Sequence, residues 1–421
     1  MRRAFLLFAA IAAAAGVLAA PAAPTGMAKQ IVVDKDKVQC PKANFTSIQA
    51  AVNAANPGDT IKVCPDQYNE SVTVNKPSLT LVGSTNISLS RCTTLSAADP
   101  TQDAIVTGAG SFSFSLQNYN ITLSGFVVQG AFDGIDTSGL FSGYRVTTNI
   151  LQNNAIRGID FLSNGTYQSR IDHNCIRTNG NGLQSEVLSG SDLRNGLVDH
   201  NVVFQNGNSG LDFSGAGARA YVTVTANDAS ANAGSAFTMD NSTGTSLDHN
   251  TSTGDGFGFF IGGGNNGLNI SNNAATDSLV NGIIFNQAAF FPVFTGANVG
   301  LTVNANTVTG AGSSGIVANV GAPNLTLSTV SNNVSSNNGR TAPRSGIRLQ
   351  AGNDNNQVTN NTADKNSANG IHADGATGNT FTNNHMNLNV EFDARDENRP
   401  ANTWTANQCT TDFPAGTICG V

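Results

Sequence analysis

Charged side chains are scarce in this chain of 421 residues: Asp, Glu, Lys and Arg make up only 12% of it. The net charge is −7, whereas a protein that binds nucleic acid non-specifically normally carries positive charge. We therefore expect no nucleic-acid partner. Low charge with 45 glycines can also indicate disorder. The apolar residues here keep a regular spacing, however, which disorder does not produce.

Long apolar runs are missing beyond the first thirty residues, so no later segment is predicted to enter a membrane. The N-terminus itself is typical of an export signal. Arg2 and Arg3 precede the apolar stretch Ala4 to Ala20, and small residues for cleavage follow at Leu18-Ala19-Ala20 or Pro21-Ala22-Ala23. We expect residues 1–23 to be removed and the mature protein to be a secreted, extracellular monomer.

No CxxC pair occurs among the six cysteines, which argues against a cysteine metal site; disulfides suit an exported protein. Six cysteines allow fifteen pairings. Proximity in sequence favours Cys409–Cys419 and Cys40–Cys64, which leaves Cys92 to pair with Cys175.

A short phrase, an apolar residue three places before an asparagine, recurs ten times. A Gly-apolar or Ala-apolar step follows each of the first nine asparagines, usually after eight or nine residues, and successive asparagines lie 23 to 33 residues apart. Such a phrase with variable spacers predicts a solenoid. The asparagines are Asn149, Asn174, Asn201, Asn227, Asn250, Asn273, Asn306, Asn333, Asn361 and Asn384.

Each repeat predicts three short strands with asparagine at the bends. Strands of neighbouring coils stack about 4.8 Å apart, so equivalent asparagines are expected to form a hydrogen-bonded ladder. A second asparagine five residues later, such as Asn154 or Asn179, is expected to cap the next bend. Crossovers between parallel strands are right-handed in nearly all cases. The predicted fold is an all-β, single-stranded, right-handed parallel β-helix of about a dozen coils.

Both ends of such a solenoid need covers, because a terminal coil exposes unpaired strand edges. A short amphipathic helix is expected from Ser47 to Ala55, stopped by Pro57-Gly58. The expected organisation is an N-terminal cap with this helix over 31–59, the β-helix over 60–392, and a disulfide-closed C-terminal cap over 393–421.

The segments Phe45–Val52, Pro57–Val63, Val72–Val74 and Leu79–Gly83 resemble the opening of pectin-lyase-like β-helix proteins. The asparagine and Gly-Ile units resemble the parallel β-helix repeats of bacterial members of that superfamily. The resemblance covers about residues 31–421. It implies the fold strongly and the activity weakly, because the superfamily includes lyases, glycosidases, esterases, epimerases and inactive surface proteins.

The superfamily's enzymes usually work on the outer face of the strand after the Gly step. Asp136, Asp160 and Asp212 are the catalytic candidates there, with Gln184 between the last two as a substrate-binding residue. Asp136 and Asp160 are expected about 5 Å apart, which resembles a retaining glycosidase pair. Two other interpretations stay open: these are ordinary polar residues on a solvated strand, or they bind Ca²⁺. The predicted outward residues, coil by coil, are Asp136, Asp160, Gln184, Asp212, Thr238, Phe260, Ile284, Val317, Arg348 and His372.

Several family motifs are absent: an Asp-Asp pair, Gly-His-Gly, Asn-Thr-Asp, and a lyase-type set of Ca²⁺-binding acids with a nearby Arg. Arg340, Arg344 and Arg348 form a cationic group about 24 Å from Asp212, too far to act on the same bond. Arg344 and Arg348 are predicted to bind a uronate or sulfate; an ordinary solvated loop is the other interpretation.

Three histidines, His173, His200 and His249, each follow an aspartate and precede a ladder asparagine. The coil between the last two carries Ala226 instead, so copied bend residues explain the pattern better than a metal site does. We therefore expect no metal ligand set and no required cofactor, with Ca²⁺ left open. The predicted function is polysaccharide binding or processing, as a hydrolase or lyase. The alternative is a non-catalytic surface or adhesion protein.

Overall fold

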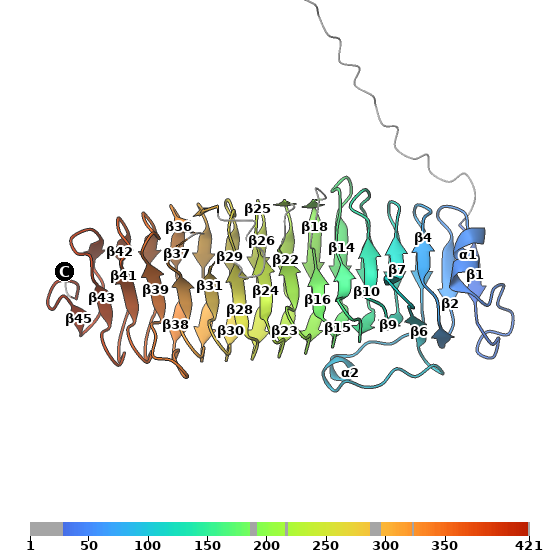
Figure 1. Cartoon of the computed structure of the whole chain (residues 1–421), viewed down its shortest axis with the longest axis horizontal. Helices are drawn as coiled ribbons and strands as arrows, with labels where there is room; N and C mark the ends of the chain where they lie inside the picture. The colour runs from blue at the N-terminus through green and yellow to red at the C-terminus, as the bar shows by residue number, and fades with distance from the viewer. Residues whose placement is uncertain (1–27, 186–191, 215–217, 287–295, 322–323, 420–421) are drawn as a thin grey trace, which may run out of the picture.

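The computed structural model describes residues 28–185, 192–214, 218–286, 296–321 and 324–419. The predicted export signal, residues 1–23, lies outside these ranges. The chain forms a long rod in which each coil stacks on the one before, from the helix α1 at one end to the C-terminal strands at the other (Figure 1). It is the all-β parallel β-helix that the repeat predicts.

Three long sheets run the length of the rod, and all named strand pairs within them are parallel. Sheet 1 has 15 strands: β1 Gln30–Val33, β2 Thr60–Val63, β5 Thr80–Val82, β8 Thr122–Ser124, β11 Arg145–Thr147, β14 Ser169–Asp172, β18 Gly196–Asp199, β22 Thr223–Thr225, β26 Ser246–Asp248, β29 Asn269–Ser271, β33 Thr302–Asn304, β37 Thr329–Ser331, β40 Gln357–Thr359, β42 Thr380–Thr382 and β44 Thr403–Thr405. Sheet 2 has 11 strands: β3 Asp66–Tyr68, β6 Ala104–Thr107, β9 Phe126–Gln129, β12 Ile150–Gln152, β15 Cys175–Arg177, β19 Val202–Phe204, β23 Asp228–Ser230, β27 Thr251–Thr253, β30 Ala274–Thr276, β34 Thr307–Thr309 and β38 Val334–Ser336.

Sheet 3 carries the candidate site and has 14 strands: β4 Val72–Val74, β7 Phe112–Leu116, β10 Asp133–Thr137, β13 Arg157–Asp160, β16 Asn181–Gln184, β20 Leu211–Phe213, β24 Ser235–Met239, β28 Phe257–Ile261, β31 Ile283–Phe285, β35 Ile316–Ala318, β39 Ile347–Gln350, β41 Ile371–Asp374, β43 Ala394–Asp396 and β45 Asp412–Phe413. Two small sheets join the loops that follow it: β17 Leu193–Arg194, β21 Arg219–Ala220 and β25 Ser242–Thr243 in one, and β32 Asn298–Val299 with β36 Leu325–Thr326 in the other.

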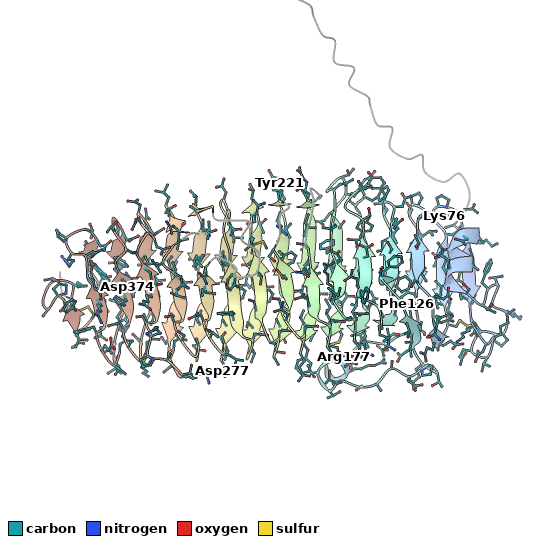
Figure 2. All side chains as sticks on the ribbon, in the orientation of Figure 1. Lys76, Phe126, Arg177, Tyr221, Asp277 and Asp374 are labelled. Carbon is teal, nitrogen blue, oxygen red and sulfur yellow. A yellow bond between two sulfur atoms is a disulfide. The ribbon has the colours of Figure 1, made fainter. Side chains whose placement is uncertain are left out.

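The core is a continuous apolar column inside the rod, because alternate residues of each short strand point inward. Aromatic rings stack along it. Phe237 and Phe259, from neighbouring coils, lie 4.8 Å apart between ring centroids and are nearly parallel. Figure 2 shows the other side chains radiating outward along the whole rod.

Each bend between sheets 1 and 2 is made by two residues rather than by the asparagine alone. The residue before the asparagine takes the left-handed conformation, as Thr148 (φ 53°), His173 (φ 54°) and Ala226 (φ 53°) do. The asparagine that follows is buried, and its side chain bonds to the next coil: Asn149 Nδ2 donates to Asn174 Oδ1 at 3.1 Å. All ten predicted asparagines are buried in this ladder, which ends on Asn407.

The N-terminal cap is built around α1 (Ile48–Ala54), whose buried residues Ile48, Ala51 and Val52 cover the first coil. Ser47 caps the helix by accepting a hydrogen bond from the Ala50 amide at 3.2 Å. At the other end Trp404 stacks on Phe381 with 3.9 Å between ring centroids, and Cys409 is bonded to Cys419.

A connection between β5 and β6 leaves the solenoid and packs along sheet 2, with the short helix α2 (Leu89–Thr93) at its far end (Figure 1). Cys92 in α2 is bonded to Cys175 in β15, and Cys40 to Cys64, so all three predicted disulfides are present. The buried Arg177 secures the connection by donating to the carbonyls of Cys92 at 3.0 Å and Ser96 at 2.6 Å.

Candidate functional site

The outward residues of sheet 3 form one in-register line along the rod, which we call the outer stripe. Asp136 pairs with Asp160, Asp160 with Gln184, and Gln184 with Asp212. The line continues in register through Thr238, Phe260, Ile284, Val317, Arg348 and His372 to Arg395. The structure thus brings the three predicted aspartates together on one face.

A partly buried arginine joins the acidic residues at the N-terminal part of the stripe. Arg157 contacts Asp160 Oδ2 at 2.7 Å through Nη1, and Asp133 Oδ2 at 3.5 Å. Its Nε donates to Gln184 Oε1 at 3.0 Å. Arg157 therefore holds Asp133, Asp160 and Gln184 in one polar network.

Asp136 has a different environment from Asp160, although the two are neighbours in the sheet. Burial raises the pKa of Asp136, and the hydrogen bond from Ser115 Oγ (2.9 Å to Oδ2) and the charge of Arg157 only partly oppose the shift. Burial thus makes the proton of Asp136 harder to lose, while Asp160 is paired with a cation. Two adjacent carboxyl groups in such different environments are the arrangement from which an acid catalyst beside a carboxylate can be built.

Gln184 and Asp212 are enclosed, which argues against the interpretation that they are ordinary polar residues on a solvated strand. They are only 5% and 6% exposed. Gln184 Nε2 donates to Asp212 Oδ2 at 3.2 Å, and the amide of Ser214 donates to Asp212 Oδ1 at 3.1 Å. This part of the stripe is therefore buried within the protein and is not an open strand face.

Beside Asp212 lie two buried charged residues that the sequence analysis missed, Arg219 and Asp240. Burial, together with the charge of Asp212, raises the pKa of Asp240 to about 7. Burial lowers the pKa of Arg219 to about 10 although Asp240, Asp212 and Asp192 oppose the shift. Arg219 Nη2 donates to the carbonyl of Ser185 at 2.6 Å, which ties the loop after β20 to the loop after β16.

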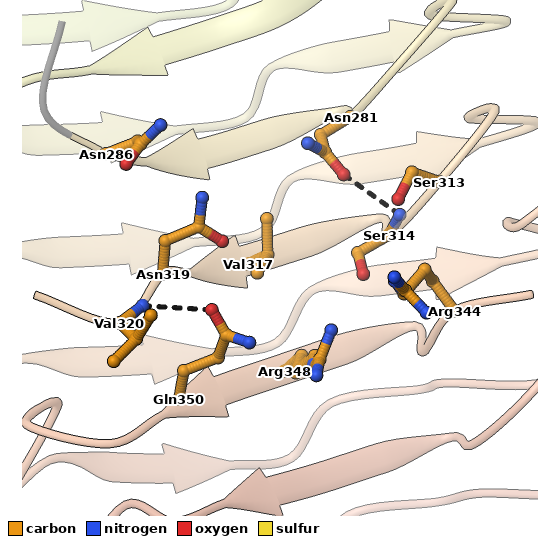
Figure 3. A pocket seen from close by; sticks show the side chains of 10 residues that line it. All are labelled: Asn281, Asn286, Ser313, Ser314, Val317, Asn319, Val320, Arg344, Arg348 and Gln350. Atoms are coloured by element: carbon orange, nitrogen blue, oxygen red, sulfur yellow. Dashed lines mark hydrogen bonds between the residues drawn. The ribbon is translucent and has the colours of Figure 1, made fainter. Parts of the chain in front are cut away.

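The middle of the stripe is apolar, and beyond it the basic part borders a polar cavity of about 330 Å³ (Figure 3). Arg344 and Arg348, the two arginines predicted to bind substrate, both line it. Its walls are tied together by bonds from Ser314 N to Asn281 Oδ1 and from Val320 N to Gln350 Oε1, each 2.9 Å.

The three arginines of the predicted cationic group differ in their partners. Arg348 is bound to Asp374, with 2.9 Å from Nε to Oδ2. Arg340 lies 3.5 Å from Asp277. Arg344 is exposed and, within the described part of the chain, is paired with no carboxylate. Arg344 is therefore the guanidinium best placed to meet an anionic group of a ligand.

The three Asp-His-Asn phrases form a structural motif at the bends, as expected. His173 and His200 stack with 5.0 Å between ring centroids, and each Nδ1 bonds the preceding aspartate, at 2.9 Å to Asp172 and 2.8 Å to Asp199. Parallel rings direct their nitrogen lone pairs in parallel as well, so they do not converge on one ion.

The sequence contains a pattern that could have predicted part of the Arg157 network. Asp133 and Arg157 each stand directly before the glycine of a Gly-Ile step, and they pair in register. They form a second outward line beside the stripe. No comparable signal marks Arg219, which begins β21 in a small sheet outside the repeat.

Comparison with known proteins agrees with the fold. No protein-family model matches the chain, and no curated protein matches its sequence. Among solved structures, a mannuronan C-5 epimerase A-module from Azotobacter vinelandii is similar, with TM-score 0.54 and 18% identity over 87% of this chain and 94% of that one. DFA-IIIase from Arthrobacter chlorophenolicus A6 in complex with GF2 has TM-score 0.51 and 16% identity, covering 86% and 93%.

The catalytic domain of an alpha-1,3-glucanase in complex with tetrasaccharides has TM-score 0.52 and 13% identity, covering 96% of this chain and 70% of that one. At such identities the likeness establishes the fold, a right-handed parallel β-helix. None of the helices in the described residues is long and apolar enough to cross a membrane.

Proposed function

We propose that this protein processes a polysaccharide that binds along the outer stripe, and that it cleaves glycosidic bonds at Asp136 and Asp160. The observation that carries the proposal is the in-register pair itself: one carboxyl group is desolvated and the next is held by Arg157. The epimerase, the DFA-IIIase and the glucanase named above share the fold, and their names connect them with carbohydrates. That likeness supports the substrate class and not the reaction.

In this proposal Asp136 is the general acid, because burial raises the pKa of its carboxyl group and so favours a proton there for the leaving oxygen. Asp160, paired with Arg157, attacks the anomeric carbon or stabilises the positive charge that develops there. Strands in a sheet are about 4.8 Å apart, a spacing that matches the roughly 5–5.5 Å between the carboxyl groups of retaining glycosidases. Asp212 and Gln184, enclosed beside this pair, are assigned to positioning the sugar.

The basic part of the stripe is proposed as a distal subsite. A glycan that lies along the rod from Asp160 passes the apolar middle and reaches Arg344 at the cavity shown in Figure 3. An unpaired guanidinium favours a uronate or sulfate there. Export, predicted from the N-terminal sequence, would place the protein where such polymers occur.

The test is an activity screen of the mature protein on polygalacturonate, alginate, and neutral and sulfated glycans, followed by Asp136→Asn and Asp160→Asn on the substrate found. Each change should lower kcat by about 10²-fold or more, since general acid–base catalysis contributes 10²–10⁴-fold. Retention of anomeric configuration, read by NMR, is the expected outcome for this carboxylate spacing.

Asp228→Asn is the matched control, because Asp228 lies on β23 of sheet 2, away from the stripe. Full activity in Asp160→Asn would refute the assignment. Glycan binding without any product would instead support the non-catalytic alternative.

A further inference from the structure

The C-terminal end of the outer stripe contains a cluster that neither the repeat nor the proposed reaction explains. It is a grid of three neighbouring strands, β39, β41 and β43, each contributing two outward positions. One line of the grid is Arg348, His372 and Arg395; the other is Gln350, Asp374 and Glu397. Figure 2 marks Asp374 near this end of the rod.

His372 is the unusual member of the grid. Its side chain is only 7% exposed, yet among the residues that the structure describes no group forms a hydrogen bond with its Nε2. The nearest acidic atom is Glu397 Oε1 at 3.5 Å, too far for a good hydrogen bond. A buried nitrogen normally has a partner, so the absence of one points to a missing ligand.

We propose that His372, Asp374 and Glu397 bind a divalent transition-metal ion such as Zn²⁺. One ligand atom from each residue lies within 4.8 Å of the others. Tetrahedral sites with bonds of about 2.0–2.2 Å place ligand atoms about 3.5 Å apart, so small side-chain rotations complete the geometry. One imidazole with two carboxylates suits Zn²⁺ better than Ca²⁺, which takes 6–8 oxygen ligands.

The surrounding groups hold the ligands in place. Arg348 Nε and Gln350 Nε2 both donate to Asp374 Oδ2, at 2.9 and 3.1 Å, which leaves Oδ1 outside these bonds. Arg395 Nη2 lies 2.9 Å from Glu397 Oε1. Ligating carboxylates are usually bonded in this way by an outer shell.

The residues around the proposed metal site carry both negative and positive charges, and their balance sets the expected affinity for the metal ion. Asp374, Glu397 and Glu391 face Arg344, Arg348 and Arg395 across a cavity of about 260 Å³. Arg348 and Arg395 lie beside the three proposed ligands, bound to Asp374 and Glu397. The two arginines weaken the attraction for a cation, and the cavity leaves room for water or a ligand as the fourth partner.

The experiment is isothermal titration of the chelator-treated full chain with Zn²⁺, repeated with Ca²⁺. One Zn²⁺ per chain is expected, with weaker or no binding of Ca²⁺. Co²⁺ in place of Zn²⁺ should give a visible absorption band from the site. Both signals should weaken at least about tenfold in His372→Gln and in Glu397→Gln, because loss of even an outer-shell partner costs 10–100-fold.

The control variant is the double change His173→Ala with His200→Ala, which removes the exposed imidazole pair on another face. It should leave the Zn²⁺ signals unchanged. The proposal is wrong if the wild-type chain binds no Zn²⁺, if the double variant abolishes binding, or if both His372→Gln and Glu397→Gln bind normally. A melting curve of each variant shows that it is folded, and activity on a glycan is not needed for any of these outcomes.

Discussion

Asp212, Arg219 and Asp240 form a buried group of charges between the strand ends and loops of sheet 3. Burial disfavours the charged form of each of these residues, so the three are stable together only when their remaining positive and negative charges offset one another. Asp240 is the member most affected, since Asp212 adds like-charge repulsion to the effect of burial. Burial also raises the pKa of Asp136.

Asp240 should make the folded state less stable as the pH rises. Its pKa is about 7 when folded and near 3.9 when unfolded, so the folded chain binds more protons between these values. Stability is therefore lost as the pH rises from about 4 to about 7, by an amount on the order of 4 kcal/mol for this residue.

Asp240→Asn removes the titrating carboxyl group. The free energy of unfolding should then depend less on pH between about pH 4 and about pH 7. Denaturant unfolding of both proteins at pH 5, 6, 7 and 8 measures the difference, in which other titrating groups cancel. Equal pH dependence in the two proteins would show that Asp240 is ionised throughout.

The asparagine ladder is the feature that joins one coil to the next at the level of strands and bends. Strand pairing satisfies the backbone within each sheet, and the bends between sheets 1 and 2 depend on the side chains. Asn201 accepts from Asn174 N and Nδ2 at 3.0 Å each, and donates to Ile171 O and Asn227 Oδ1 at 2.9 Å each. One residue therefore bonds three successive coils.

Asn201→Ala should lower the free energy of unfolding by about 1–3 kcal/mol, because it leaves buried donors and acceptors in both neighbouring coils without partners. Thermal and denaturant unfolding measure the change. Asn208→Ala is the control: Asn208 is exposed, and its replacement should shift stability by less than about 0.5 kcal/mol. Equal effects of the two changes would contradict the ladder's role.

The whole molecule is a rod whose contacts run between neighbouring coils, so its two ends are where an unpaired edge would be exposed. Trp404 covers Phe381 at the C-terminal end and is anchored by a 2.8 Å bond from Nε1 to Asp396 Oδ2. The N-terminal end is closed by α1, which Glu70 fastens by accepting hydrogen bonds from the amides of Ile48 and Gln49.

Removal of residues 399–421 should make the chain associate into larger species than the intact chain forms, since it exposes Phe381 and the edges of the last coil. Size-exclusion chromatography with light scattering distinguishes the two states. The intact mature chain, run at the same concentration, is the reference. A truncated chain that forms no larger species than the intact chain and is equally stable would mean that the tail is not a seal.

Part of the site could be predicted from the repeat, and part could not. Asp136, Asp160, Gln184 and Asp212 occupy one phase of the repeat, and the register of sheet 3 places them side by side. Arg219 follows no period. Arg348 and Asp374 come from adjacent coils, as the repeat predicts, but the sequence did not show that Asp374 rather than a ligand would bind Arg348.

Sequence alone determined the coil, the ladder, the disulfide partners and the line of outward residues, because a solenoid brings together residues one repeat apart and the period can be read directly. Only the tertiary structure decided which outward carboxylates are desolvated, which are bound to arginine, and that His372 is buried without a partner. The physical reason is that protonation and solvation depend on every group within a few ångströms, including loops that the repeat does not encode.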